Sequence, residues 1–265
     1  MRDRIAQILR LTLGAAGVLG VLCLLPAAAW SGEESEKTLF ERSNQNYRDG
    51  KYAEAVQGYE KLAQAHPDSA VFLYNLANSY YRTGEIGLAI LNYERVLLND
   101  PRHTDSRNNL EYARKLLEYR IEDKRNWYLR SGEQILEWFT EQEVTLIVLA
   151  VYFGFAAATG LALLYKSGQP WGWRRRLLVV FLIGSVALWG AKKLETRFFR
   201  DAIITAKEAE VRYGPSSSDQ TAFRLGVGLK VYVVDRREKW SRIILVNGKD
   251  GWVPNDQLVE VGALR

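Results

Sequence analysis

The chain has almost none of the residues that usually carry nucleophilic catalysis or metal binding. Its 265 residues include one cysteine, Cys23, and two histidines, His66 and His103. Without the N-terminal segment that holds Cys23, no disulfide, thiolate nucleophile or cysteine metal site remains. The histidines lie next to Pro67 and near Pro101, in equivalent loops, where solvated turn residues are usual. No nucleophile–base pair stands out, so we expect no enzyme activity, no cofactor and no metal.

Charge is absent from two long stretches, Val144–Tyr165 and Leu177–Ala191. The first is long enough to cross a bilayer core of about 30 Å as a helix. The second covers only about 22 Å at 1.5 Å per residue, so it has to recruit its flanks. We predict transmembrane helices over 144–165 and 177–193, joined by a tip at 166–176. The lack of charge within either stretch argues against a transporter or a proton path.

The tip predicts the orientation of this hairpin in the bacterial inner membrane. It contains basic residues and no acidic one, which places it in the cytoplasm by the positive-inside rule. These topology signals are Lys166, Arg174, Arg175 and Arg176. The regions before and after the hairpin then lie on the periplasmic face. The net charge of +5 lies beside the apolar stretches rather than on a folded domain, so no nucleic-acid partner is expected.

Residues 1–29 have the composition of a secretory signal. Arginines precede the apolar run Leu11–Leu25, and small residues follow it. We predict cleavage after Ala29, with an uncleaved anchor as the alternative. Lipoprotein processing at Cys23 is disfavoured, because the preceding Leu22 is bulky where a small residue is needed. Both alternatives export the rest of the chain.

Residues 36–101 repeat with a period of 34. The matched pairs are Tyr47 and Tyr81, Gly50 and Gly84, Ala55 and Ala89, Tyr59 and Tyr93, Glu60 and Glu94, and Pro67 and Pro101. Glycine permits a tight turn between helices, alanine permits close approach, and proline ends the second helix. The spacing resembles the tetratricopeptide repeat. It implies an all-α solenoid over 36–120, made of two repeats and a capping helix at Asp105–Tyr119.

The first helices of such repeats line a concave groove that binds protein segments. The groove candidates are Phe40, Asn44, Tyr47, Tyr74, Asn75, Asn78, Tyr81 and Arg82. Asparagine there can hold a peptide backbone, because its amide both donates and accepts hydrogen bonds. Asn44 and Asn75 match the asparagines of carboxylate-clamp repeats, but Phe40, Asp105 and Asn109 replace the basic positions of that clamp. This argues against binding of a free C-terminal carboxylate. As an alternative, some of these tyrosines only pack helix on helix.

Residues 121–143 mix aromatic and acidic side chains and form a juxtamembrane linker. Aromatic residues such as Trp127 and Trp138 favour the headgroup level just before a membrane helix. As the alternative, this segment packs on the repeat domain.

Residues 202–262 change to short β-rich runs between turns, which predicts a small all-β barrel. The expected strands are Ala202–Val211, Leu229–Val234, Lys239–Val246, Gly251–Pro254 and Leu258–Val261, with a turn at Asn247–Gly248. The order of motifs resembles the bacterial SH3 domain: Val211-Arg212 with Gly214-Pro215, Lys230-Val231, Trp240 with Ile243, and Gly251-Trp252-Val253-Pro254.

The SH3 resemblance implies a ligand face made by Tyr213, Trp240 and Pro254, with Trp252 more suited to the core. The paired tyrosines that read a Pro-rich helix are missing, since Ile204–Ala206 holds their place. Peptides and cell-wall fragments both remain open as ligands.

Signal, repeats, hairpin and SH3 module in this order resemble the BatE family of the Bacteroides aerotolerance operon. The resemblance implies a membrane-anchored partner of a stress-tolerance system, beside von Willebrand A-type membrane proteins and a MoxR-type ATPase. The residues themselves predict a non-enzymatic scaffold with two binding modules. The alternative is a peptidoglycan-binding envelope protein that acts through residues 202–265.

Overall fold

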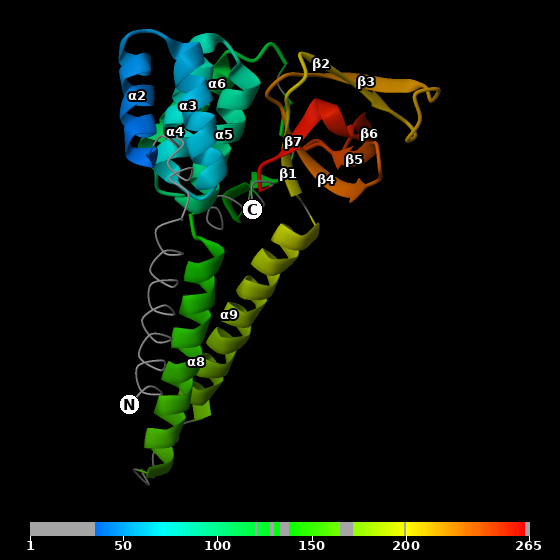
Figure 1. Cartoon of the computed structure of the whole chain (residues 1–265). Helices are drawn as coiled ribbons and strands as arrows, with labels where there is room; N and C mark the ends of the chain where they lie inside the picture. The colour runs from blue at the N-terminus through cyan, green and yellow to red at the C-terminus, as the bar shows by residue number, and fades with distance from the viewer. Residues whose placement is uncertain are drawn as a thin grey trace, which may run out of the picture. The chain divides into compact units, whose positions relative to one another are not determined.

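The computed structural model describes residues 35–119, 121–123, 125–127, 130–132, 138–164, 172–198 and 200–262 (Figure 1). The predicted signal segment, its cleavage site after Ala29 and the tip residue Lys166 lie outside these residues.

The first part of the described chain is a run of helix–turn–helix hairpins, which we call the helical repeat region (Figure 1). Its helices are α2 (Glu36–Arg48), α3 (Tyr52–Ala65), α4 (Ala70–Thr83), α5 (Ile86–Asn99) and α6 (Thr104–Lys115). Gly50 and Gly84 form the hairpin turns with φ of 77° and 86°, a conformation that glycine adopts at little cost. The predicted helical-repeat character of this region is confirmed.

The pairs of residues that are 34 positions apart occupy matching places in the core. Ala55 and Ala89 are fully buried, and Tyr59 and Tyr93 are each 1% exposed. Helix α4 packs against α3 and α5, and α5 packs against α6. The small alanine side chains let the two helices of each hairpin approach closely.

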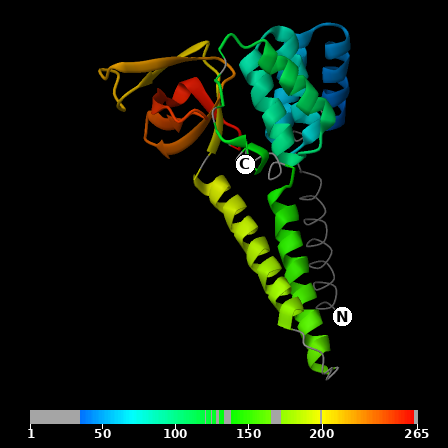
Figure 2. The ribbon, with the colours of Figure 1, turned by 180° about the vertical axis from the view of Figure 1, so that it is seen from behind.

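The two apolar stretches form helices α8 (Glu141–Leu164) and α9 (Gly172–Phe198), which lie side by side (Figure 2). The Trp189 indole of α9 donates to the Thr145 hydroxyl of α8 at 3.2 Å. Helix α8 begins with a capping box, because the Thr140 amide donates to the Glu143 carboxylate at 3.0 Å and the Glu143 amide donates to the Thr140 hydroxyl at 3.1 Å.

Within the part of the chain that the structure describes, no helix combines the length and apolarity needed to cross a membrane. The two predicted transmembrane helices are therefore not confirmed. Helix α9 also differs from its predicted bounds, because it takes in the basic residues at both ends of its apolar stretch. Arg174 and Arg175 lie in its first turn, and Arg176 is exposed.

Residues 200–262 form a seven-stranded antiparallel sheet, which we call the C-terminal sheet (Figure 1). Its strands are β1 (Arg200–Ile204), β2 (Glu208–Arg212), β3 (Thr221–Gly226), β4 (Lys230–Arg236), β5 (Trp240–Ile244), β6 (Asp250–Pro254) and β7 (Leu258–Glu260). The strand order is β3-β2-β6-β5-β4-β1-β7. The expected all-β character is thus confirmed.

Two strand predictions need correction. The run Ala202–Val211 is not one strand, because the chain turns between Ile204 and Glu208 and places β1 and β2 far apart in the strand order. Strand β3 was missed, since the burial of Thr221–Gly226 does not alternate along its length. It forms because β2 supplies its ladder partner, a pairing that crosses a loop.

The core of the C-terminal sheet is made mostly of aliphatic side chains. Its most buried members include Ile204, Val211, Val231, Ile243 and Val253, each 0% exposed. Leu117 and Ile121, which follow α6 in the chain, pack against this same core.

Candidate functional site

The candidate site is a cavity of about 190 Å³ across the first helices of the repeats, which we call the groove. Its lining residues are Tyr47, Asn78, Tyr81, Tyr93, Asn109 and Tyr112. The structure therefore brings together side chains from α2, α4, α5 and α6. Three of the predicted groove candidates, Tyr47, Asn78 and Tyr81, are among them.

Asn78 anchors the floor of the groove. Its side-chain oxygen accepts from the Tyr93 hydroxyl at 2.6 Å and from the Asn109 amide at 3.0 Å. The Asn109 amide also lies 3.4 Å from the Tyr74 hydroxyl. These bonds use the acceptor of Asn78 inside the protein, so its oxygen is not available to a bound peptide.

The first repeat contains the same bond. The Tyr59 hydroxyl donates to the Asn44 side-chain oxygen at 2.7 Å, and both residues stand 34 positions before Tyr93 and Asn78. Each bond joins the first helix of a hairpin to the second. Asn44 was predicted as a ligand contact, and the structure gives its oxygen this structural role.

Burial raises the pKa of Tyr59 to about 12, and the nearby Tyr47 adds to this shift. Burial also raises the pKa of the Tyr93 hydroxyl well above its ordinary value. Both phenols therefore keep their protons at neutral pH and remain hydrogen-bond donors to the two asparagines.

The other groove candidates do not line this cavity. Phe40 packs between helices, with its ring 5.4 Å from Phe72. The Arg82 guanidinium is exposed and stacks 4.3 Å over the ring of Tyr52. Asn75 is half-buried on α4.

Tyr74 and His103 form a ring contact at 5.1 Å beside the groove. His103 was expected to be a solvated turn residue, but its Nδ1 accepts from the Ser106 amide and caps α6. Ser69 caps α4 in the equivalent position. Helix α6 thus begins as α4 does, 34 residues later.

Three lining residues, Tyr93, Asn109 and Tyr112, were not among the predicted groove candidates. Tyr112 is the most exposed of them. It is 61% exposed, the most exposed tyrosine of the helical repeat region. Continuing the 34-residue period into α6 would have found it, because Tyr112 corresponds to Asn78 and Asn109 corresponds to Asn75. Helix α6 is therefore equivalent to the first helix of a third repeat.

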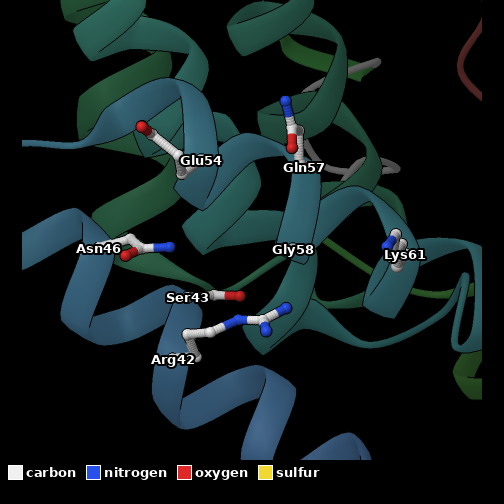
Figure 3. A pocket seen from close by; sticks show the side chains of 7 residues that line it. All are labelled: Arg42, Ser43, Asn46, Glu54, Gln57, Gly58 and Lys61. Carbon is white, nitrogen blue, oxygen red and sulfur yellow. The ribbon is translucent and has the colours of Figure 1, made fainter. Parts of the chain in front are cut away.

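A second pocket, of about 260 Å³, lies between α2 and α3 (Figure 3). Its lining is polar and consists of Arg42, Ser43, Asn46, Glu54, Gln57, Gly58 and Lys61. The equivalents of Arg42 and Ser43 in the second repeat are Leu76 and Ala77, which are buried. The two repeats therefore differ at this pocket, because Arg42 is exposed where its equivalent Leu76 is buried.

The predicted ligand face of the C-terminal sheet is brought together only in part. Trp240 of β5 lies opposite Pro254 of β6. Tyr213 is 71% exposed and follows the end of β2, away from that pair in register. Trp252 is 8% exposed beneath the guanidinium of Arg237, 4.6 Å above its ring, as expected for a core residue.

The carboxylates and histidines of the described segments do not gather in threes that could hold a metal ion. Glu94 of α5 is a carboxylate with a shifted pKa. The pKa of Glu94 is lowered, because Lys230 and Arg114 outweigh the opposing effect of its burial. Glu94 is thus a buried carboxylate that stays charged.

Comparison with protein families finds a match over the helical repeat region. Residues 32–139 match the model of the YfiO family, described as an outer membrane lipoprotein. The matched range contains the whole helical repeat region and ends just before α8. Among curated proteins no match to this chain was found, so membership of the BatE family stays a prediction. Over its helical repeat region, the chain is similar to the YfiO family of outer membrane lipoproteins.

Proposed function

We propose that this protein is a non-enzymatic scaffold of the cell envelope that captures a segment of a protein partner in the groove. The observation that carries the proposal is the line of tyrosine and asparagine side chains across three successive first helices. The similarity to an outer membrane lipoprotein family supports an envelope location.

The groove suits an extended peptide. Tyr47, Tyr81 and Tyr112 offer aromatic faces for apolar side chains and hydroxyls for backbone carbonyls. The half-buried Asn75 amide can both donate to and accept from a peptide backbone. The exposed Arg82 adds a positive charge beside the groove and favours a segment with an acidic residue.

The second part of the proposal is attachment to a membrane through α8 and α9. Both helices expose many large apolar side chains, more than a water-facing surface normally carries. The most exposed are Leu146, Phe153, Leu161, Leu177, Val180, Phe181 and Ile183, between 56% and 68%. In the proposed topology the pair enters the inner membrane with its basic tip in the cytoplasm, and both ends face the periplasm. Confinement to one membrane would raise the effective concentration for partners there.

The resemblance to the BatE family suggests the partners, namely von Willebrand A-type membrane proteins of an aerotolerance or stress-tolerance system. The C-terminal sheet would bind a second ligand through the face made by Trp240 and Pro254, and the exposed Tyr213 is a separate candidate contact. The alternative function is peptidoglycan binding through this face. Co-sedimentation of the full chain with peptidoglycan, lost in Trp240→Ala and Tyr213→Ala variants, would favour that alternative.

The groove is tested by replacing exposed side chains and comparing partner capture. Tyr112→Ala with Arg82→Ala is expected to reduce the partners recovered from envelope extracts at least tenfold. The matched control is Gln57→Ala with Lys61→Ala, which changes the polar N-terminal pocket and should leave recovery unchanged. Circular dichroism confirms that both variants fold. Equal recovery of partners with both double variants would contradict the proposal that the groove binds the partner.

The topology is tested with a reporter fused after Arg265. A reporter that is active only after export should be active, and the chain should remain in the membrane fraction at high salt and alkaline pH. If the reporter is instead located in the cytoplasm, the helical repeat region and the C-terminal sheet lie on opposite sides of the membrane. That result would contradict the proposal of a scaffold at one membrane face.

A further inference from the structure

The second hairpin of the helical repeat region differs from the first on one side of its second helix. Three exposed positions of α3 become three buried positions of α5. The equivalent pairs are Ala53 and Gly87, Gln57 and Leu91, and Lys61 and Arg95. Because α3 and α5 are the equivalent second helices of two successive repeats, the difference indicates that an element outside the repeats covers α5.

The covering element is the C-terminal sheet, and Arg95 marks the contact. Arg95 is 9% exposed. Its Nε donates to the Val261 carbonyl oxygen at 3.0 Å, and a terminal nitrogen lies 3.4 Å from the Glu260 carbonyl oxygen. A buried cation needs such acceptors. The carbonyl oxygens at the end of β7 therefore accept hydrogen bonds from a buried arginine of the helical repeat region.

Opposite charges cross the same contact. Glu94 pairs with Arg114 of α6, and its carboxylate also lies 3.8 Å from the Lys230 amine of β4. Lys230 in turn pairs with Asp201 of β1 at 2.8 Å. The four side chains form one network that joins two helices to two strands. The equivalent of Glu94 in the first repeat, Glu60, bonds only within the helices among the described contacts.

The segment after α6 belongs to this contact as well. In a complete third repeat it would lead into a second helix, but 117–119 and 121–123 are not helical. Leu117 and Ile121 pack instead against the core of the C-terminal sheet. At Gly228 a Cβ would lie 2.6 Å from Leu117 Cδ2 and 2.9 Å from Ile90 Cδ1, so helix and linker both press on the backbone of this turn.

From these contacts we infer that the C-terminal sheet is the C-terminal cap of the helix stack and replaces the missing second helix of a third repeat. A helix stack needs such a cap, because its last hairpin otherwise exposes apolar surface. This goes beyond the proposed function, in which the groove and the sheet bind separate ligands. The docked side of the sheet is closed to partners, and the groove keeps a fixed position relative to the face made by Trp240 and Pro254.

Gly87 provides a sharp test in the full chain, purified in detergent. A Cβ at this position would lie 2.5 Å from Val227 Cγ2 and 3.3 Å from the Ile204 carbonyl oxygen, so Gly87→Ala collides with the docked sheet. Alanine is a better helix former than glycine, and Ala53 occupies the equivalent position of α3. Without docking, the substitution should leave Tm unchanged or raise it. With docking, we expect Tm to fall by about 3 °C or more.

Two further measurements separate loss of docking from general damage. Hydrogen exchange should rise in 200–204 and 226–231, on the sheet side, when only α5 has been changed. Val227→Ala removes the colliding methyl groups and should restore at least half of the lost Tm in the double variant. The matched control Ala53→Gly should leave exchange in the sheet unchanged.

A higher Tm for Gly87→Ala, or exchange changes confined to 86–99 with no rescue by Val227→Ala, would overturn the inference. If Gly87→Ala does not fold, Arg95→Met serves in its place. It should raise exchange in 257–262 if the sheet is docked, and leave it unchanged if it is not.

Discussion

Arg95 of α5 donates from Nε to the carbonyl oxygen of Val261 at 3.0 Å, across 166 positions of the chain. Burial lowers the pKa of Arg95 to about 10, with Tyr80 opposing the shift, so the group is still charged at pH 7. A charged group is therefore held at the contact by backbone carbonyls. Removing the guanidinium would leave a buried carbonyl oxygen without its hydrogen-bond donor.

Replacing Arg95 by methionine should destabilise the folded chain by about 2 kcal/mol, because the Val261 carbonyl loses its donor at a buried site. Urea unfolding followed by circular dichroism measures the change. Lys61→Met, at the exposed equivalent position of α3, is the matched control and should change the unfolding free energy by less than about 0.5 kcal/mol. Equal effects of the two substitutions would contradict the role given to Arg95.

The repeated tyrosine–asparagine bond can be tested in each hairpin. Tyr59→Phe and Tyr93→Phe each remove one hydroxyl donor and should each cost about 1 kcal/mol in thermal unfolding. The cost should be larger for Tyr59, because Asn78 keeps the Asn109 amide as a second donor. Tyr112→Phe, which changes an exposed hydroxyl, is the control. A neutral Tyr59→Phe would show that the bond does not hold the hairpin.

Stability at alkaline pH should depend on the same phenol. The folded pKa of Tyr59, about 12, exceeds its unfolded value of 10, so folding favours the protonated form. The resulting stability is fully present below pH 10 and is lost as the pH rises through 12. Unfolding midpoints measured between pH 9 and 12 should therefore fall less steeply in Tyr59→Phe than in the wild type. Identical slopes would contradict the pKa shift.

The start of α8 depends on the capping box of Thr140 and Glu143. Thr140→Ala removes the cap and should destabilise the first turn by about 1 kcal/mol, seen as faster hydrogen exchange over 141–146. Glu143→Gln keeps an acceptor for the Thr140 amide but loses the ion pair with Arg102, at 2.8 Å on the surface. It should therefore raise that exchange, but by less than Thr140→Ala does. Faster exchange in Glu143→Gln than in Thr140→Ala would reject this order.

The acid dependence of that helix start follows from the same carboxylate. The pKa of Glu143 is lowered, first by its hydrogen bond with Arg102 and then by the Thr140 amide. Its contribution is present at neutral pH and is lost as the pH falls through the lowered pKa. Exchange over 141–146, corrected for the intrinsic pH effect, should rise in acid for the wild type and stay flat in Glu143→Gln.

Local pattern predicted the helical repeat region well because its interactions are local. The period of 34 located both turns at Gly50 and Gly84, and the buried pairs Ala55 with Ala89 and Tyr59 with Tyr93. The period did not predict the role of each individual side chain. Asn44 was predicted to contact a ligand, but its side-chain oxygen accepts a hydrogen bond from Tyr59. Whether an asparagine bonds to a ligand or to a neighbouring helix depends on the three-dimensional placement of its side chain.

The β region was harder to predict for the same physical reason. Strand β3 exists because β2 pairs with it, and the turn between Ile204 and Glu208 sends β1 and β2 to different neighbours. Such pairings depend on contacts across loops rather than on the residues of the strand alone.

By itself the sequence determined the helical hairpins, the apolar stretches that became α8 and α9, and the β character of the last segment. Periodicity and composition act through neighbours a few residues apart, so they can be read along the chain. The tertiary structure alone decided that α5 is covered by the C-terminal sheet. That contact joins Arg95 to Val261 and Glu94 to Lys230, and no local pattern marks residues that meet only when two distant surfaces fit.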